Sequence, residues 1–143
     1  MTELFLLACV DGHDIAIDAG QIDAVVDIGP VVPVPRTDPA IRGLAALRSR
    51  VATVIDTRLV LGLAPSPEGM RRAITTSIDG HLYAFLVDTL DDVAPFERQP
   101  LTGGVALMSG WRTAAAGLIE HGGKPLLVID LAALAGAGTA LAA

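Results

Sequence analysis

The sequence contains an internal repeat, which restricts the chain to folds with two similar halves. One motif near the start recurs 68 residues later, and two further motifs recur 74 residues later. The matched pairs are Asp11-Gly12-His13 with Asp79-Gly80-His81, Gly43-Leu44 with Gly117-Leu118, and Val54-Ile55-Asp56 with Val128-Ile129-Asp130. Each match alone is weak, because Asp-Gly is a common hairpin turn. Their shared order, with a single change of offset, predicts a pseudo-symmetric protein with two β lobes.

Short apolar segments follow one another along the chain, and 15 glycines and 9 prolines separate them. Strands at such spacing, without a long amphipathic helix, favour an all-β barrel or sandwich. The expected strands cover residues 4–10, 13–18, 24–28, 51–56, 71–78, 82–87, 90–94, 117–120 and 125–130. Short helical segments are expected from Asp38-Pro39 to just before Gly43, over residues 57–61, and over residues 131–135 before a frayed tail.

The composition argues against several classes of protein. The 143 residues carry a net charge of −6, a single lysine and 3% aromatic residues, which disfavours a nucleic-acid partner. Cys9 has no partner for a disulfide, and its apolar surroundings predict a buried, inert thiol in a reducing compartment. The longest uncharged stretch, residues 131–143, is shorter than the roughly 20 residues that span a bilayer. We therefore expect a cytoplasmic protein without membrane insertion.

The sequence lacks the usual motifs of a catalytic, metal or cofactor site. His13 and His81 follow hairpin turns, where histidines usually face solvent, and their acidic neighbours are too close in sequence to complete a zinc site. Asp91 and Asp92 are adjacent in a strand and so point to opposite faces. Gly136-Ala137-Gly138 lacks the strand, helix and later acidic residue of a dinucleotide loop. We therefore expect no enzyme activity, no metal and no cofactor.

Residues 34–62 carry the most specific pattern, V-P-R-T-D-P-A-I-R-G-L-A-A-L-R-S-R-V-A-T-V-I-D-T-R-L-V-L-G. This stretch resembles the central segment of the CheW family of bacterial chemotaxis coupling proteins, which typically shows Val-Pro, Ile-x-Gly, Leu-Arg-Gly and a strand ending in Asp-Leu-Arg. The later stretches G-H-L-Y-A-F-L-V-D-T-L-D-D-V and L-L-V-I-D-L-A-A-L resemble its second half. The resemblance implies a single domain over residues 1–143, built as two pseudo-symmetric, intertwined five-stranded SH3-like barrels with a few short helical turns.

The resemblance also implies a scaffold that bridges the cytoplasmic tip of a methyl-accepting chemoreceptor and the regulatory domain of a CheA-type histidine kinase. Arg48 falls on the arginine of Leu-Arg-Gly, and Asp27 falls near the acidic residue of the family's Val-x-Glu-Ile strand. The family pairs these charges, so we expect an Asp27–Arg48 contact; two independent surface charges are the alternative. The expected partner-binding residues are Val25, Asp27 and Arg48, then Ile41, Gly43 and Leu44 beside the receptor-facing groove, and Val87 and Asp88 on the opposite lobe.

One departure from the family pattern lies in this central segment. Ser49 stands where the family usually has glycine, and serine tolerates a positive φ poorly, so we expect a reshaped turn there. Two alternatives stay open. The chain could be a divergent adaptor for another pathway, such as twitching motility or development. It could also be a small-molecule-binding β domain, which would need a deep pocket with convergent polar groups between the lobes.

Overall fold

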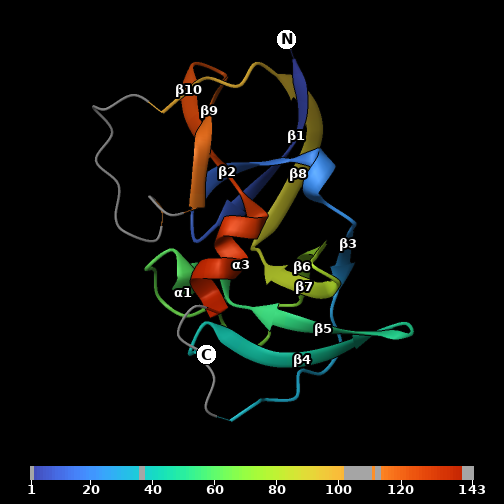
Figure 1. Cartoon of the computed structure of the whole chain (residues 1–143). Helices are drawn as coiled ribbons and strands as arrows, with labels where there is room; N and C mark the ends of the chain where they lie inside the picture. Colours follow the sequence, from blue (N-terminus) through green and yellow to red (C-terminus); the bar gives the residue numbers. More distant parts are fainter. Residues whose placement is uncertain (1, 36–37, 102–110, 112–113, 140–143) are drawn as a thin grey trace.

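Ten strands form two five-stranded sheets in the part of the chain that the computed structural model describes, residues 2–35, 38–101, 111 and 114–139 (Figure 1). The strands are β1 (Glu3–Val10), β2 (His13–Asp18), β3 (Ala24–Asp27), β4 (Ile41–Leu47), β5 (Arg50–Ile55), β6 (Arg72–Ile78), β7 (His81–Leu86), β8 (Thr89–Phe96), β9 (Ala115–His121) and β10 (Lys124–Ile129). The helical elements are the 3-10 turn η1 (Ala19–Gln21) and the helices α1 (Thr57–Val60) and α3 (Leu131–Thr139). The predicted all-β class is confirmed.

The two sheets have the same strand arrangement. Sheet A has the order β8-β1-β2-β10-β9, and sheet B has the order β3-β6-β7-β5-β4. The β1–β2 hairpin of the first half pairs with β8 and β10 of the second half, and β9 pairs with β10. The β6–β7 hairpin of the second half pairs with β3 and β5 of the first half, and β4 pairs with β5. In each sheet one parallel pair, β2 with β10 or β5 with β7, joins the halves. The halves are therefore intertwined, and the hairpins that carry the repeated Asp-Gly turns occupy equivalent places.

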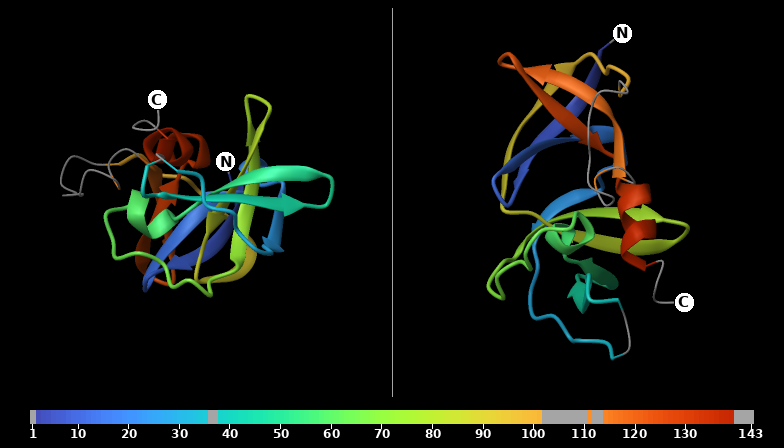
Figure 2. Two further views of the ribbon diagram at one scale, coloured as in Figure 1. Left: turned by 90° about the horizontal axis from the view of Figure 1, so that it is seen from below. Right: turned by 90° about the vertical axis from the view of Figure 1, so that its left-hand side faces the viewer.

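Each sheet is closed into a barrel by the segment that follows one of its edge strands. After β3, Val32 exchanges two backbone hydrogen bonds with Leu44 of the opposite edge strand β4, with N···O distances of 2.8 and 2.9 Å. After β8, Gln99 does the same with Leu118 of β9, at 2.7 and 2.8 Å. We call the closed sheets barrel A and barrel B. They lie one above the other, with α3 beside their boundary and packed against α1 (Figure 2).

Alternation along the strands separates three hydrophobic cores. In β1, Phe5 and Leu7 point into barrel A, whereas Leu6, Ala8 and Val10 point into a larger core between the barrels. In the strands of barrel B, alternate residues likewise point into the interior of barrel B or into the shared core. Successive side chains of a strand face opposite sides of the sheet, so one strand supplies two cores. We call the boundary formed by the shared core the seam.

Two predictions about local structure were wrong. The expected short helix from Asp38-Pro39 is a turn, in which the Ala40 N–H donates to Asp38 Oδ1 at 2.8 Å, and the next seven residues form β4. At the C-terminal side, α3 continues to Thr139 instead of ending at residue 135. In both cases tertiary pairing or packing, with β5 for β4 and with α1 for α3, outweighs the local glycine and alanine pattern.

Candidate functional site

The seam reaches the surface along β3 and β8, edge strands that lie on the same side of the molecule (Figure 1). Val25 of β3 is paired with Ile74, and Val93 of β8 is paired with Leu6. Directly opposed residues share a face, and Ile74 and Leu6 belong to the shared core, so the two valines extend that core to solvent. Val25 is 39% exposed and Val93 52%, and Leu4, on the same face as Leu6, is 55% exposed. These three exposed side chains form what we call the seam surface.

Asp27 shares the face of β3 that carries Val25. Its Oδ1 lies 3.1 Å from Nε of Arg72, the directly opposed residue on β6, and both side chains are exposed. The expected Asp27–Arg48 contact is therefore wrong. Arg48 lies at the tip of the β4–β5 hairpin, which belongs to the opposite edge of sheet B. The two charges are independent surface charges, the alternative left open by the sequence.

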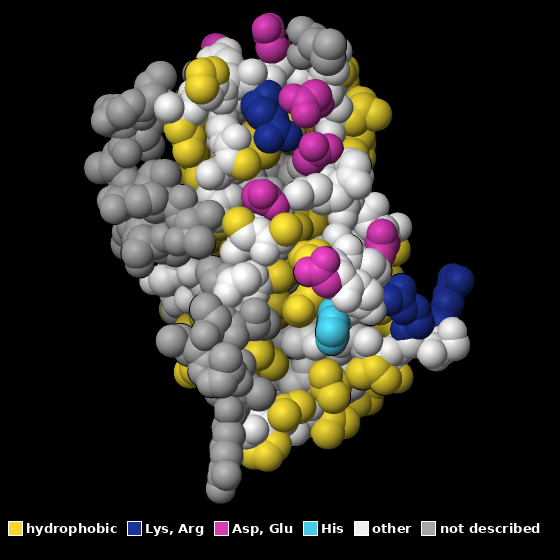
Figure 3. Space-filling model, in the orientation of Figure 1, with side chains coloured by type: hydrophobic (Ala, Val, Ile, Leu, Met, Phe, Trp, Pro, Cys, Tyr) yellow, Lys and Arg dark blue, Asp and Glu magenta, His cyan; other side chains and the backbone are white. Residues whose placement is uncertain are grey.

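A second apolar surface covers the outside of β4 and β5. Ala45, Ala52 and Val54 point into barrel B, so the alternate residues of these strands point outward. The outward apolar side chains are Leu44 and Val51, which are 38% and 61% exposed, together with exposed Ala46 and the neighbouring Val32 at 65%. We call this set the β4–β5 face. In Figure 3 it appears as a hydrophobic band at the lower end of the molecule, with the blue side chains of arginines at the protruding tip.

The tip of the β4–β5 hairpin presents cationic side chains. Arg48 and Ser49 form its two-residue turn, and Arg48 has φ 56°, a left-handed conformation that is uncommon for a residue other than glycine. The sequence predicted strain at Ser49; the structure places the positive φ one residue earlier. Arg50 Nη1 donates to Ser77 Oγ at 3.4 Å, and within the described residues Arg48 forms no ion pair or hydrogen bond. Its guanidinium is therefore free to meet a partner.

Gly43 and Ile41 of β4 are buried or partly buried, so they support the barrel and do not present an exposed contact surface. Gly43 is buried with φ 141°, and a Cβ added there would lie 2.1 Å from the carbonyl oxygen of Val32. Gly117 takes the same place in barrel A, where an added Cβ would lie 2.9 Å from the carbonyl oxygen of Gln99. The repeated Gly-Leu pair thus allows the closing segment of each barrel to approach. Ile41 is partly buried and pairs with Ile55.

Val87 and Asp88 lie in the connection between β7 and β8, where the chain crosses from barrel B to barrel A. Val87 is only 1% exposed and belongs to the shared core, so it cannot contact a partner directly. The Asp88 carboxylate accepts a hydrogen bond from the Asp11 backbone N–H at 2.9 Å and forms an ion pair with Arg58 Nη2. Arg58 Nη1 also lies 3.5 Å from Asp11 Oδ1. These contacts tie α1 of barrel B to the β1–β2 turn of barrel A.

The protonation of this cluster follows its geometry. Burial raises the pKa of Asp88, but the hydrogen bond from Arg58 and the backbone N–H of Asp11 together outweigh burial and hold the pKa below its ordinary value. The hydrogen bond to Asp88 raises the pKa of Arg58. Both groups are therefore charged at neutral pH, and the cluster, which sequence reasoning missed, has a structural role. The Asp-x-Arg sequence at the end of β5 was its only signal.

A second buried carboxylate, Asp56, was also missed. It is fully buried and accepts hydrogen bonds from the Ser66 backbone N–H at 2.9 Å, the Ser66 hydroxyl at 2.6 Å and Arg42 Nη2 at 3.0 Å. Burial raises its pKa, but the Ser66 hydroxyl, the Ser66 N–H and Arg42 more than offset this and lower the pKa below its ordinary value. Its repeat partner Asp130 caps α3, accepting from the Ala132 N–H at 2.9 Å, and binds Gln21. The repeated Val-Ile-Asp motif thus anchors the segments that follow β5 and β10.

The described residues contain no cluster of three or more His, Cys, Asp and Glu side chains that could hold a metal ion. None of the helices in the described ranges has the length and apolar character to cross a membrane. Cys9 is partly buried, not fully buried as the sequence predicted. Of the expected partner-binding residues, Val25 belongs to the seam surface and Asp27 lies beside it on β3. Leu44 belongs to the β4–β5 face, and Arg48 lies at its tip.

Comparisons with known proteins agree with this architecture. A family model described as a CheW-like domain matches residues 4–138. The chemotaxis protein CheW of Thermotoga maritima is 24% identical over 122 residues, covering 85% of this chain and 80% of that protein. The crystal structure of the scaffolding protein TtCheW from Thermoanaerobacter tengcongensis has a TM-score of 0.79 at 19% identity, covering 91% of this chain and 90% of that one. At that identity the likeness to the solved structure establishes the fold.

Proposed function

The chain belongs to the family of CheW-like domains, and from that premise we propose that it is a non-catalytic adaptor in a bacterial signalling array. Its two partners are the cytoplasmic tip of a methyl-accepting chemoreceptor and the regulatory domain of a CheA-type histidine kinase. Such partners place the protein in the cytoplasm. The curated relative is named a chemotaxis protein and the solved relative a scaffolding protein, which supports this role.

The observation that carries the proposal is the presence of two separate apolar surfaces on one rigid body. The seam surface carries exposed apolar side chains on edge strands of both barrels, which suits the apolar face of an amphipathic helix laid across the boundary. The β4–β5 face is the outside of a sheet with a cationic tip, a shape that suits a folded domain with an acidic rim. We assign the helical receptor tip to the seam surface and the kinase regulatory domain to the β4–β5 face, which moves Leu44 from the receptor-facing place expected from the sequence to the kinase-facing surface.

The small-molecule alternative asked for a deep pocket with convergent polar groups between the lobes. The space between the barrels is filled by the shared core, whose members include Phe85, Ile129 and Leu134, each at most 1% exposed. This packing favours the adaptor over a ligand-binding domain with a central site. The other alternative, a divergent adaptor for twitching motility or development, keeps the adaptor role and changes the partners.

The test is a pair of matched substitutions at exposed valines, one on each surface. Val25→Glu should weaken binding of the receptor tip by about tenfold or more and leave kinase binding unchanged, and Val51→Glu should have the opposite effect. Isothermal titration calorimetry with each purified partner measures both affinities, and each variant is the control for the other. The proposal fails if wild-type protein binds neither partner. The surface assignment fails if both variants affect the same partner.

A further inference from the structure

The open end of barrel B contains a cavity of about 510 Å³. Ile28, Val54 and Leu86, all members of the barrel B core, form its apolar floor. Its walls come from the closing segment after β3 and from the loop before β6. The lining residues on these walls include Pro30, Val31, Pro33, Glu68, Met70 and Arg71. An apolar group that entered this cavity would extend the barrel B core.

The equivalent end of barrel A is nearly filled, with a cavity of only about 60 Å³. The side chain of Arg98 occupies this end: its guanidinium lies 5.4 Å from the centre of the Phe5 ring, and it forms ion pairs with Glu3 at 3.3 Å and with Asp18 at 3.2 Å. Arg98 comes directly before Gln99, the residue whose backbone bonds close barrel A. Barrel A therefore fills its own end with a long side chain that has an apolar stem and a charged head.

In barrel B the equivalent residue cannot fill the cavity. Val31 precedes the closing residue Val32 as Arg98 precedes Gln99, but valine is much shorter than arginine. The position of Asp18, which binds Arg98, is taken in barrel B by Leu86, at the repeat offset of 68 residues. Barrel B thus has the same architecture as barrel A, without an internal occupant and with an apolar residue where barrel A has an anion.

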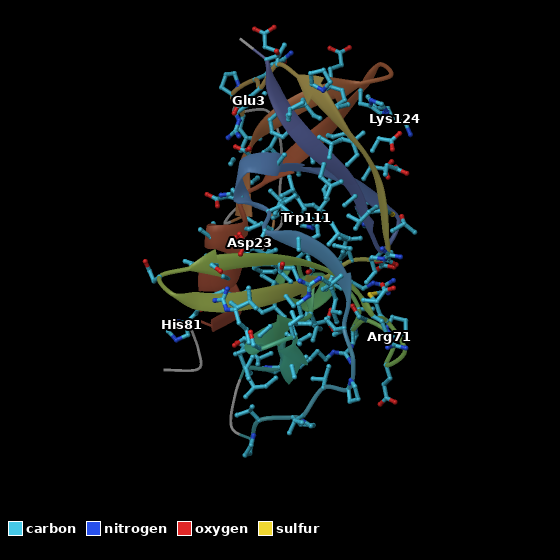
Figure 4. All side chains as sticks on the ribbon, turned by 90° about the vertical axis from the view of Figure 1, so that its right-hand side faces the viewer. Glu3, Asp23, Arg71, His81, Trp111 and Lys124 are labelled. Atoms are coloured by element: carbon cyan, nitrogen blue, oxygen red, sulfur yellow. The ribbon has the colours of Figure 1, made fainter. Side chains whose placement is uncertain are left out.

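The hydrogen-bond donors of the cavity are guanidinium groups. Arg42 lines the cavity. Its Nε and Nη2 donate hydrogen bonds to Asp56 and to the Ser66 carbonyl, which leaves Nη1 without a hydrogen bond in the described residues. Arg71 Nε donates a hydrogen bond to the carbonyl oxygen of Ile28 at 3.0 Å. In the described ranges, both of its terminal amino groups are therefore without a hydrogen-bond partner. Figure 4 shows Arg71 on the side of barrel B away from His81. The one acidic lining residue is Glu68 on the loop before β6.

We propose that the end of barrel B binds a peptide segment of a partner protein that carries an aliphatic side chain next to a carboxylate. The aliphatic group packs on Ile28, Val54 and Leu86, and the carboxylate accepts hydrogen bonds from Arg71 and from Nη1 of Arg42. Glu68 opposes the anion and limits its affinity. The charge pattern is the reverse of that in barrel A, where carboxylates surround a cationic head.

The way barrel A fills its own end is evidence that the occupant of the barrel B cavity is a peptide side chain. In barrel A the cavity receives the Arg98 side chain from the closing segment, and backbone hydrogen bonds between Gln99 and Leu118 hold that segment. In barrel B the closing residue Val32 already takes the equivalent backbone position, so a partner segment supplies only the side chain that enters the open end. This site shares no lining residue with the seam surface or the β4–β5 face, although Val32 of that face lies between the lining residues Val31 and Pro33. The probe titration uses neither receptor nor kinase, so its result does not depend on those assignments.

The test is a titration followed by methyl NMR, with N-acetyl-Leu-Glu-amide as the probe and N-acetyl-Leu-Gln-amide as its uncharged match. We expect the methyl signals of Ile28, Val54, Leu86 and Met70 to shift with the acidic probe, and to shift at least about threefold more weakly with the uncharged one. Val31→Arg, which places an arginine where barrel A has Arg98, should reduce the shifts about tenfold. Val32→Arg, the neighbouring exposed residue that does not line the cavity, is the matched control and should leave them unchanged.

Two exposed substitutions keep the test informative if Val31→Arg impairs folding. Arg71→Gln should weaken binding of the acidic probe, and Glu68→Gln should strengthen it about threefold. The proposal is overturned if no methyl shifts occur up to about 10 mM probe, a weak limit of affinity, or if both probes bind equally. It is also overturned if hexanoate binds as well as the peptide, because the site would then accept a small acid and not a segment of a protein.

Discussion

Arg58 and Asp88 form an ion pair that joins the two barrels at the point where the chain passes from one to the other. Arg58 lies in α1 of barrel B. The Asp88 carboxylate also accepts a hydrogen bond from the backbone N–H of Asp11 in barrel A. Asp11 has φ 49° and Gly12 has φ 79°, as in the common Asp-Gly hairpin turn, and the same carboxylate holds this turn in place. This contact fixes how the barrels sit against each other, and therefore the shape of the seam surface between them.

Replacing Asp88 with asparagine should lower the free energy of unfolding by about 1–3 kcal/mol, because a partly buried guanidinium loses its charged partner. Chemical denaturation of the purified protein measures the change. Asp91→Asn removes an exposed carboxylate of the neighbouring strand β8 and should change the stability by less than about 0.5 kcal/mol. An equal effect of the two substitutions would contradict the role of Asp88 as a brace.

The stability should also depend on pH in the acid range. The pKa values of Asp56 and Asp88 in the folded protein lie below the ordinary value of 3.8, so the unfolded chain binds protons first as the pH falls. Stability is therefore complete above about pH 5 and decreases as the pH falls through 3.8 and below. Denaturant midpoints between pH 3 and pH 7 measure this slope. Asp88→Asn should make the pH dependence of the unfolding free energy weaker. A pH dependence identical to that of the wild type would contradict the lowered pKa of Asp88.

Gly43→Ala should destabilise the protein by about 1–3 kcal/mol or more, because the new methyl group collides with the backbone of Val32 and the φ of 141° suits only glycine. Gly69→Ala is the matched control, since nothing lies within 4 Å of a Cβ added there. Thermal unfolding of both variants provides the comparison. If Gly43→Ala were neutral, the closing segment of barrel B would not need the close approach seen here.

Arg48→Gly should raise stability and weaken partner binding at the same time. Glycine relieves the positive φ, a gain of about 1 kcal/mol, while the loss of the free guanidinium should reduce affinity for the kinase regulatory domain severalfold. Asp79→Gly relieves a similar φ of 51° at the tip of the β6–β7 hairpin and should leave kinase binding unchanged. Calorimetric titration together with thermal unfolding separates the two effects. Unchanged affinity after Arg48→Gly would remove Arg48 from the proposed interface.

The overall fold could be predicted from the sequence because its repeated motifs have local structural causes. The Asp11-Gly12 and Asp79-Gly80 turns form equivalent hairpins, and the Gly43 and Gly117 positions allow equivalent closures. Strand β4 was missed because its alanines and its glycine have low strand propensity, and only its pairing with the hairpin partner β5 and the closing bridge to Val32 define it.

The site could be predicted only in part. Val25, Asp27, Leu44 and Arg48 are exposed as a partner contact requires, but they lie on two surfaces that no linear pattern separates. Val87 and Asp88 are apolar and charged neighbours in sequence, as at many surfaces, yet the first is buried in the shared core and the second pairs with Arg58. Such pairings depend on the packing of two barrels, which is a property of the tertiary structure.

The most direct test of the adaptor proposal is whether both partners bind one molecule of this protein at the same time. The measurement is a calorimetric titration of the kinase regulatory domain into the protein alone and into the protein saturated with the receptor tip. Because the seam surface and the β4–β5 face are separate, we expect the second titration to reach the same one-to-one stoichiometry, with an affinity equal to or higher than the first. Loss of kinase binding in the presence of the receptor tip would show that the two partners compete for one surface, and would contradict the account.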